Sequence, residues 1–182
     1  LLAKELPRLT ILAGLFAGSA LACKYPAVLL IVIPSGLWIA WQQTDRRQVF
    51  VFALAVVAAC GPWLAKNAIQ TGNPVYPLLA SVLGGTSRTP AKNEQFRRAH
   101  EVPPFTMTQL ASSVTDISLN SSGQSPLLIP LGIFSLLALR GRPELRRYFA
   151  PTCLLLTWMF ACWWIFTHRI ERFWYPAFPL LT

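Results

Sequence analysis

Charged side chains are scarce in this sequence, and acidic ones are the scarcest. Only 13% of the 182 residues are Asp, Glu, Lys or Arg, against about 25% in ordinary soluble domains, while 54% are hydrophobic. The few charges stand between long apolar blocks, which is typical of membrane proteins. We therefore expect an all-α fold, a polytopic bundle of transmembrane helices, and not a soluble globular core.

Asp and Glu number 7 against 16 Lys and Arg, so the net charge is +9 and the pI is about 10.0. In a soluble protein such a balance would suggest nucleic acid as a partner. Here the basic residues stand beside apolar blocks, where they orient helices and meet phosphate headgroups. We therefore expect membrane lipids as partners and no nucleic acid.

The motifs of soluble enzymes are missing as well. The sequence has no Walker loop, no GxGxxG, no GxSxG and no HExxH. His100 and His168 are its only histidines, and neither has a cysteine beside it. The four cysteines are scattered without metal-ligand spacing, so we interpret them as packing residues and expect no metal site from this chain alone. They are Cys23, Cys60, Cys153 and Cys162.

Six apolar stretches are candidate membrane spans in a single membrane-embedded domain, residues 1–182. Tryptophan side chains near their ends match the aromatic belt of membrane proteins. In the first stretch, Gly14 and Gly18 form a GxxxG that favours close helix packing. The predicted spans lie near 9–23, 26–41, 49–64, 126–139, 149–166 and 173–182, and residues 65–125 form one long outer segment.

Within that outer segment, two stretches have a recognisable pattern. GNPVYPLL, which begins at Gly72, combines turn residues with an apolar patch that could lie on the membrane surface. KNEQFRRAH, residues 92–100, is typical of a short amphipathic helix.

The distribution of Lys and Arg predicts the orientation. One side of the predicted bundle carries more of them, and the positive-inside rule places that side in the cytoplasm. The outer segment then lies outside, in a multi-pass protein that we expect in the bacterial inner membrane. The cytoplasmic set is Lys4, Arg8, Arg46, Arg47, Arg140, Arg142, Arg146 and Arg147.

The remaining cations near span ends, Lys24, Lys66, Arg169 and Arg172, lie on the side that this rule does not favour. One interpretation is that they anchor helices by reaching to the headgroups, with Glu171 pairing locally. The other is a phosphate clamp, because Arg donors match phosphate oxygens. On a continuous helix, Arg169 and Arg172 would share a face.

Three stretches resemble the GT-C class of membrane glycosyltransferases, and they occur in that family's order. GLFAGSALACKYPAVLL is similar to the Gly-rich helix that ends in a TKY or TKG turn. GPWLAKNAIQTGNPVYPLL resembles PWxxKN…TGNPVYP, and HRIERFWYPAFPLL resembles RxxRFxxPxxPLL. The class includes protein O-mannosyltransferases and lipid A aminoarabinose transferases.

The resemblance implies transfer of a sugar from a polyprenyl-phosphate donor to an acceptor outside the cytoplasm, in the cell envelope. By it, Lys24 meets the donor phosphate with Arg172 nearby, and Arg169 and His168 are further candidates. The family's acidic residue, which acts on the acceptor or holds a divalent metal, would lie upstream of this chain. We therefore expect an internal fragment that is inactive alone, with no cofactor of its own.

Two alternatives stay open at this point. A transporter or flippase for an anionic or lipid-linked substrate would need charges or broken helices near the middle of the membrane. Pro34 is the one interruption within the second span, and the span interiors hold almost no ionisable residue. A non-catalytic membrane subunit would use its basic ends only as anchors.

Overall fold

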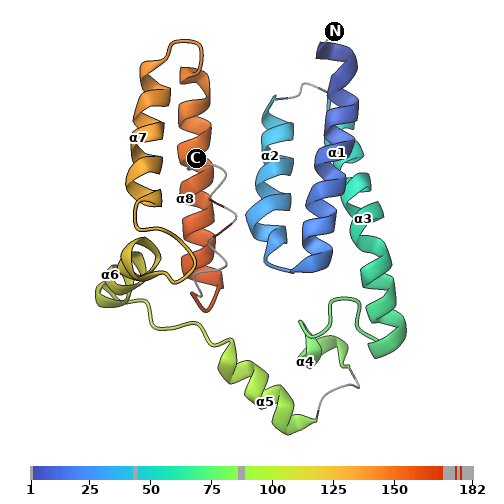
Figure 1. The fold of residues 1–182 in the computed structure, drawn as a ribbon. Helices are drawn as coiled ribbons and strands as arrows, with labels where there is room; N and C mark the ends of the chain where they lie inside the picture. The colour runs from blue at the N-terminus through green and yellow to red at the C-terminus, as the bar shows by residue number, and fades with distance from the viewer. Residues whose placement is uncertain (1, 43–44, 86–88, 170–174, 176, 178–182) are drawn as a thin grey trace. The chain divides into compact units, whose positions relative to one another are not determined.

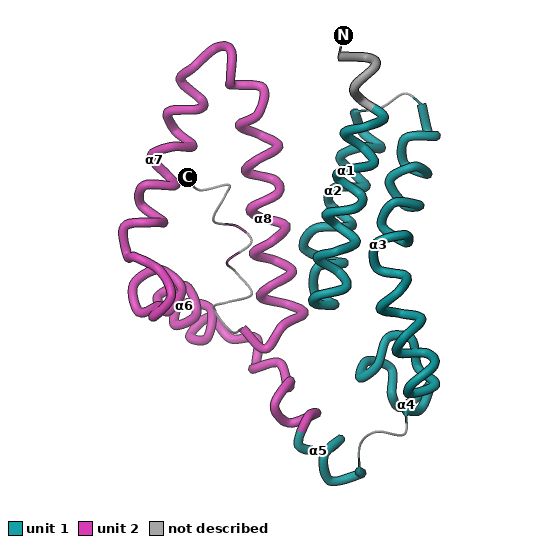
Figure 2. The backbone as a smooth tube through the Cα atoms, turned by 45° about the vertical axis from the view of Figure 1, so that its right-hand side comes forward, with its two compact units in different colours: residues 1–95 teal, residues 96–182 magenta. Residues whose placement is uncertain are grey.

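The computed structural model describes residues 2–42, 45–85, 89–169, 175 and 177. These residues form helices joined by turns and loops and include no β-strand, so the predicted all-α class is confirmed. It divides into two compact units, residues 1–95 and 96–182 (Figure 2). The elements (Figure 1) are α1 Leu2–Cys23, η1 Val28–Val32, α2 Ile33–Gln42, α3 Arg47–Thr71, α4 Ala80–Leu83, α5 Pro90–Ala99, α6 Met107–Thr115, η2 Asp116–Asn120, α7 Leu128–Gly141, η3 Arg146–Tyr148 and α8 Phe149–Phe166.

In unit 1, the two glycines of the GxxxG pack α1 closely against α3. A Cβ added to Gly14 would lie 2.6 Å from Ala55 Cβ and 2.7 Å from the Phe52 carbonyl oxygen. A Cβ added to Gly18 would collide with the Val56 carbonyl oxygen. The packing prediction for this motif is confirmed, since only glycine lets the two backbones come this close.

The core of unit 1 forms along the same contact. Ala17 from α1 and Phe52, Val56 and Cys60 from α3 are buried together. Cys60 thus fills space between helices, as expected for a packing cysteine.

The second predicted span begins with a five-residue π-helical segment, η1, and continues as α2. Pro34, at the second position of α2, has no backbone N–H to donate to a carbonyl one turn earlier. The π-helical turn lies directly before it, which is where that missing bond would have been. The interruption, from η1 to Pro34, therefore occupies the first half of the predicted span 26–41.

α3 is longer than its apolar stretch. It passes the predicted end at residue 64 and continues through Ala65, Ala68 and Gln70, all good helix formers, to Thr71. Gly72 ends it with φ 75° and donates its N–H to the Ala68 carbonyl at 2.9 Å. This is a glycine cap in the left-handed conformation, and the first residues of the predicted outer segment are therefore helical.

In unit 2, α7 and α8 lie side by side and are joined through η3 (Figure 1). Met159, Cys162 and Trp163 of α8 are buried. The short helix expected within residues 92–100 is present as α5, which crosses the boundary between the two units. Most of the sixth predicted span, 173–182, lies outside the described residues.

Two described helices, Arg47–Thr71 and Arg146–Phe166, are long and apolar enough to cross a membrane. Three shorter apolar helices, Pro7–Cys23, Val28–Gln42 and Leu128–Gly141, match three other predicted spans. Large apolar side chains point outward along these helices, among them Phe16, Trp41 and Val57 with 74%, 72% and 61% of their surface exposed. Such a surface is unusual for a monomeric soluble protein.

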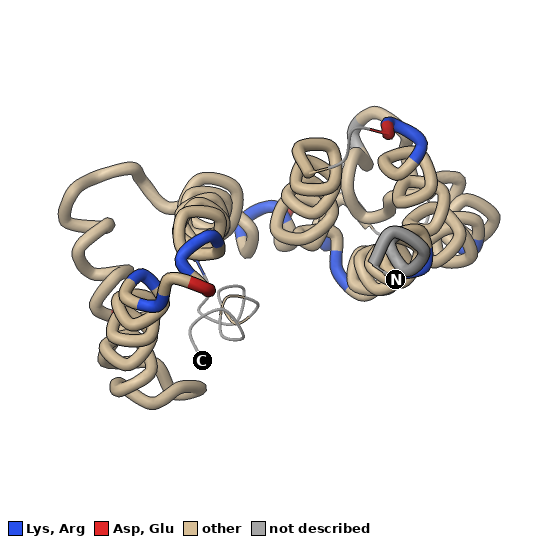
Figure 3. The backbone as a smooth tube through the Cα atoms, turned by 90° about the horizontal axis from the view of Figure 1, so that it is seen from above, with Lys and Arg blue, Asp and Glu red and all other residues tan. Residues whose placement is uncertain are grey.

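Basic residues gather at helix ends within each unit (Figure 3). In unit 1, Arg46 and Arg47 lie where α3 begins, beyond the end of α2. In unit 2, Arg140, Arg142, Arg146 and Arg147 surround the turn between α7 and α8. The helix interiors between these ends stay apolar, as expected for helices oriented by flanking cations.

Candidate functional site

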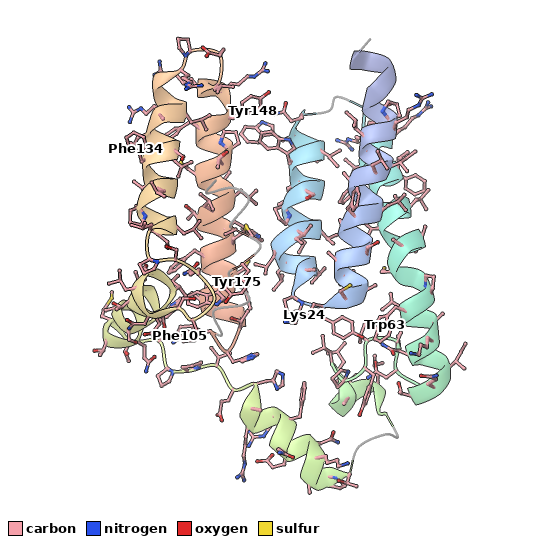
Figure 4. The ribbon with its side chains drawn as sticks, in the orientation of Figure 1. Lys24, Trp63, Phe105, Phe134, Tyr148 and Tyr175 are labelled. Carbon is pink, nitrogen blue, oxygen red and sulfur yellow. The ribbon has the colours of Figure 1, made fainter. Side chains whose placement is uncertain are left out.

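Lys24 occupies a tight turn between two apolar helices, as the sequence predicts. Its N–H makes the last bond of α1, to the Ala20 carbonyl at 2.9 Å. Its own carbonyl accepts the N–H of Ala27 at 3.0 Å, and the carbonyl of Tyr25 accepts that of Val28 at 3.0 Å. The backbone on both sides of Lys24 is therefore fixed, while its side chain is exposed at this end of unit 1 (Figure 4).

The next residue, Tyr25, ties this turn to the end of α3. Its hydroxyl donates to the Tyr76 carbonyl at 2.9 Å and accepts a hydrogen bond from Asn67 Nδ2 at 2.9 Å. Asn67 is buried, and its Nδ2 also lies 3.4 Å from the Pro74 carbonyl. Two of the three family-like stretches, CKYP and KN…TGNPVYP, are thus joined through side chains that sequence reasoning had not selected.

Lys66 precedes Asn67 but has a different environment. Its Nζ lies 5.0 Å from the centroid of the Trp63 ring, a cation–π distance, and the side chain is exposed. A Lys beside a Trp at the end of an apolar helix is the arrangement of an interfacial anchor. The geometry therefore favours the anchoring interpretation for Lys66.

Asn73 is the most completely buried polar residue of unit 1, with 0% of its surface exposed. Its Nδ2 donates to the carbonyls of Leu78 at 2.8 Å and Gly84 at 3.1 Å. Its Oδ1 accepts the N–H of Val75 at 3.0 Å. The side-chain amide of Asn73 therefore joins the beginning of the loop after α3 to Val75, Leu78 and Gly84. The sequence signal was an Asn before Pro in a stretch without charges, and it indicated only a turn.

In unit 2, α8 ends before the basic group that follows it. Thr167 Oγ1 donates to the Trp163 carbonyl at 2.6 Å and accepts the N–H of Arg169 at 3.1 Å. Arg169 then has φ 56°, a left-handed conformation rare for a residue with a side chain. Arg169 therefore lies outside the helix α8, and Arg172, the residue with which it would share a face on a continuous helix, lies outside the described residues.

The guanidinium of Arg169 is largely occupied by the protein itself. It donates through Nε to the Trp164 carbonyl at 3.2 Å, and through Nη1 and Nη2 to the carbonyls of Pro104 and Pro103 at 3.1 and 3.0 Å. Of the five N–H groups that an arginine offers, these bonds leave two. Arg169 therefore joins the segment 103–105 to the end of α8.

Two aromatic rings enclose the same guanidinium. Its Cζ lies 3.5 Å from the centroid of the Trp164 ring and 5.1 Å from that of Phe105. Burial in this apolar setting lowers the pKa of Arg169 from its ordinary value. Arginine stays charged at any physiological pH, so the consequence is a fixed positive charge with few donors left for a ligand.

The structure brings the two histidines of the chain together. The ring centroids of His100 and His168 are 4.8 Å apart, and the His100 ring stacks on Phe96 at 3.9 Å. His100 Nδ1 lies 2.8 Å from the Phe96 carbonyl oxygen. A carbonyl only accepts, so this nitrogen carries the proton in the neutral ring. Nothing in the sequence pattern had paired His100 with His168.

The four residues expected at a donor phosphate therefore do not all belong to one described cluster of side chains. His168 and Arg169 lie together in unit 2, Lys24 belongs to unit 1, and Arg172 is outside the described residues. Across the described part of the chain, no three His, Cys, Asp or Glu side chains are placed to hold a metal ion.

A sequence family described as "Domain of unknown function (DUF8201)" matches residues 5–108, which include most of α1, all of η1 and α2 to α5, the Lys24 turn and the buried Asn73. Neither the curated proteins nor the solved structures contain a significant match.

Proposed function

This chain belongs to the family of the domain of unknown function DUF8201, and we propose that it is part of an integral-membrane glycosyltransferase. The enzyme would move a sugar from a polyprenyl-phosphate donor to an acceptor outside the cytoplasm. The proposal starts from the three stretches that resemble GT-C enzymes. In this proposal the chain crosses a bacterial inner membrane six times. Its outer segment lies on the side of the membrane away from the cytoplasm.

The observation that carries the proposal is the bond network around Tyr25. A lysine that only anchors a helix needs no fixed backbone, because its flexible stem reaches the headgroups from many positions. The turn of Lys24 is instead held to α3 through Asn67 and to the loop after α3 through the Tyr76 carbonyl, by two bonds of the Tyr25 hydroxyl, each at 2.9 Å. A fixed backbone limits where the Lys24 ammonium can lie, which favours its contact with one oxygen of a bound phosphate.

The chemistry assigned to Lys24 is electrostatic. As the bond between the anomeric carbon and the phosphate oxygen breaks, negative charge grows on the departing polyprenyl phosphate. An ammonium already in place stabilises that charge without reorganisation. The attacking acceptor oxygen gives its proton to a base, and that base is not assigned to this chain.

Of the three acidic residues in the outer segment, Glu94 is half-buried, and Glu101 and Asp116 do not fill that role. Glu101 is exposed, and Asp116 is exposed and accepts a bond from Asn120 Nδ2 at 3.2 Å. Both have the environment of ordinary surface charges. The acid that the family resemblance requires is therefore not assigned to Glu101 or Asp116.

The basic residues of unit 2 have a smaller proposed role. Arg169 has two N–H groups left for a ligand, and His168 lies beside it in the sequence. A phosphate contact by these residues is proposed from the sequence resemblance, with Arg172 as the further candidate. Their exchange for Gln in the full-length protein tests it.

The decisive experiment compares two lysines in the full-length protein. We expect Lys24→Gln to lower the transfer of sugar from polyprenyl-phosphate donors by about 100-fold or more, the usual effect of removing a charge-stabilising donor. Lys66→Gln removes the same charge from the Trp63-stacked position, and we expect it to leave the rate nearly unchanged. The measurement is release of polyprenyl phosphate in proteoliposomes, across a panel of labelled donors.

Two results would contradict the proposal. Full transfer activity in Lys24→Gln would show that the cation serves only as an anchor. Movement of an intact lipid-linked donor across the membrane without any release of polyprenyl phosphate would favour the transporter or flippase.

A further inference from the structure

The loop that follows α3, residues 72–85, has a surface that does not suit water. It contains no Asp, Glu, Lys, Arg or His. Its large apolar side chains point outward, and Val82 has 77% of its surface exposed. Loops in water usually carry polar side chains, so an exposed apolar loop is a feature that needs a partner. The other exposed apolar residues of the loop are Leu78, Leu79 and Leu83.

The inside of this loop is polar and is closed to solvent. The buried Asn73 amide binds the Leu78 and Gly84 carbonyls and the Val75 N–H. Main-chain bonds add to this network, from the N–H of Leu78 to the Val75 carbonyl at 2.9 Å and from that of Gly84 to the Ala80 carbonyl at 3.1 Å. The loop thus satisfies much of its own backbone, with its apolar side chains outward.

This inside-out arrangement is the one that lipid requires. Backbone away from water must find its hydrogen-bond partners within the protein, because the bilayer offers none. An Asn that binds main-chain groups is also common in the turns of soluble proteins, so these bonds permit a lipid environment without requiring it. The observation that points to lipid is the row of exposed apolar side chains on the outside of the loop.

The loop is also attached at the right place. It begins where α3 ends, and α3 is one of the two helices able to cross a membrane. Ile69, in the last turns of α3, has 85% of its surface exposed, so the apolar surface continues from the helix to the loop. The Tyr25–Tyr76 hydrogen bond holds the loop against the end of unit 1.

We propose that the loop 72–85 inserts into the lipid interface at the membrane face where α3 ends. The loop lies at the boundary between headgroups and acyl chains. Its exposed apolar side chains then contact lipid, namely Leu78, Leu79, Val82 and Leu83. The loop then anchors the protein to the membrane in addition to α3, and it lies beside the Lys24 turn. The proposal rests on one part of the proposed function, that α3 crosses a membrane, and is independent of sugar transfer.

Site-specific fluorescent labels test the depth of the loop. The exposed Cys23 and the partly exposed Cys153 are first replaced by Ala, while the buried Cys60 and Cys162 remain. A single Cys then carries an environment-sensitive dye at Val82, with the full-length protein in phosphatidylcholine–phosphatidylglycerol vesicles. Nitroxide groups on lipid tails quench a dye in lipid, and iodide on both sides of the vesicle quenches a dye in water.

Two matched positions calibrate the result. Val57→Cys labels the middle of α3, and Lys92→Cys labels the exposed, charged α5. We expect lipid nitroxides to quench the dye at 57 and at 82, deepest at 57 and near the headgroups at 82. Iodide quenching should be severalfold weaker at 82 than at 92.

Each other outcome has a definite meaning. If iodide quenches 82 as strongly as 92 while 57 is in lipid, the loop lies in water and this proposal is overturned alone. If neither quencher reaches 82, another protein surface covers the loop, and the proposal is again overturned. If lipid nitroxides fail to reach 57, α3 does not cross the membrane, and the loop proposal fails together with the proposed function.

Discussion

A single added methyl group at the contact between α1 and α3 should destabilise unit 1 measurably. The perturbation is Gly18→Ala or Gly14→Ala. In a free helix this change is favourable by up to about 1 kcal/mol, because alanine has the better helix propensity. A destabilising result would therefore arise from packing against α3 and not from the helix itself.

The magnitude follows from the distances at each glycine. The new Cβ at Gly18 would lie 2.8 Å from Ala59 Cβ and 2.9 Å from Val56 Cα, and at Gly14 it would lie 2.6 Å from Ala55 Cβ. Carbon atoms pack best at about 3.5–4.0 Å, so α1 must move away by roughly 1 Å. Overpacking of this kind costs about 1–3 kcal/mol of unfolding free energy.

The assay is equilibrium unfolding in mixed micelles with a rising fraction of SDS, followed by tryptophan fluorescence. Gly61→Ala is the matched control, because it adds the same methyl group to α3 where nothing lies within 4 Å. We expect this control to be neutral or slightly stabilising. The double change Gly14→Ala with Gly18→Ala should cost less than the sum of the two, since one outward shift relieves both.

Two results would contradict the close contact between α1 and α3. If Gly18→Ala unfolds at the same SDS fraction as Gly61→Ala, the two helices are not in the close contact described above. A strictly additive double variant would show that the two glycines do not share one interface movement.

Three further changes test the remaining contacts. Tyr25→Phe should cost about 1–3 kcal/mol of unfolding free energy, because it leaves Asn67 and the Tyr76 carbonyl each without one hydrogen-bond partner. The control is Tyr148→Phe at an exposed site, which should cost under about 0.5 kcal/mol. Equal effects of the two would contradict the network. Asn73→Ala should cost about 2–4 kcal/mol and speed amide exchange at Val75, while Asn93→Ala on exposed α5 should do neither. Unchanged exchange at Val75 would remove Asn73 as the centre of the loop. Arg169→Gln should release residues 103–105 and raise their rate of cleavage by protease severalfold. The control is Arg142→Gln at an exposed position. The same cleavage rate in both variants would show that Arg169 does not hold this segment.

Much of the fold could be predicted from composition and local pattern. The helical class, the positions of the apolar helices and the tight turn at Lys24 follow from runs of apolar residues and the residues that interrupt them. The spacing of Gly14 and Gly18 predicts close packing against another helix, but it does not identify that helix as α3. The apolar run predicts a span near 49–64, whereas helix propensity and the Gly72 cap extend the helix α3 to Thr71, so hydrophobicity alone does not give the end of the helix.

The candidate site could be predicted only in part. Lys24 was chosen from its place between two apolar stretches, and its turn is where the sequence put it. Arg169 was chosen as a phosphate ligand because arginine suits phosphate, but its donors are largely used by the carbonyls of residues 103, 104 and 164. Sequence pattern shows what a side chain can donate, and does not show which acceptor the folded chain offers first.

Near neighbours along the chain are enough to specify the helices and their ends, because helix formation, capping and apolar periodicity act over a few residues. The pairs that join distant positions form only in the folded molecule: Tyr25 with Asn67, His100 with His168, and Arg169 with Pro103. Each pair costs chain entropy to bring together and is stabilised by bonds that form only when the helices are already packed. No local pattern records that condition, so these contacts and the chemistry they allow become visible only in three dimensions.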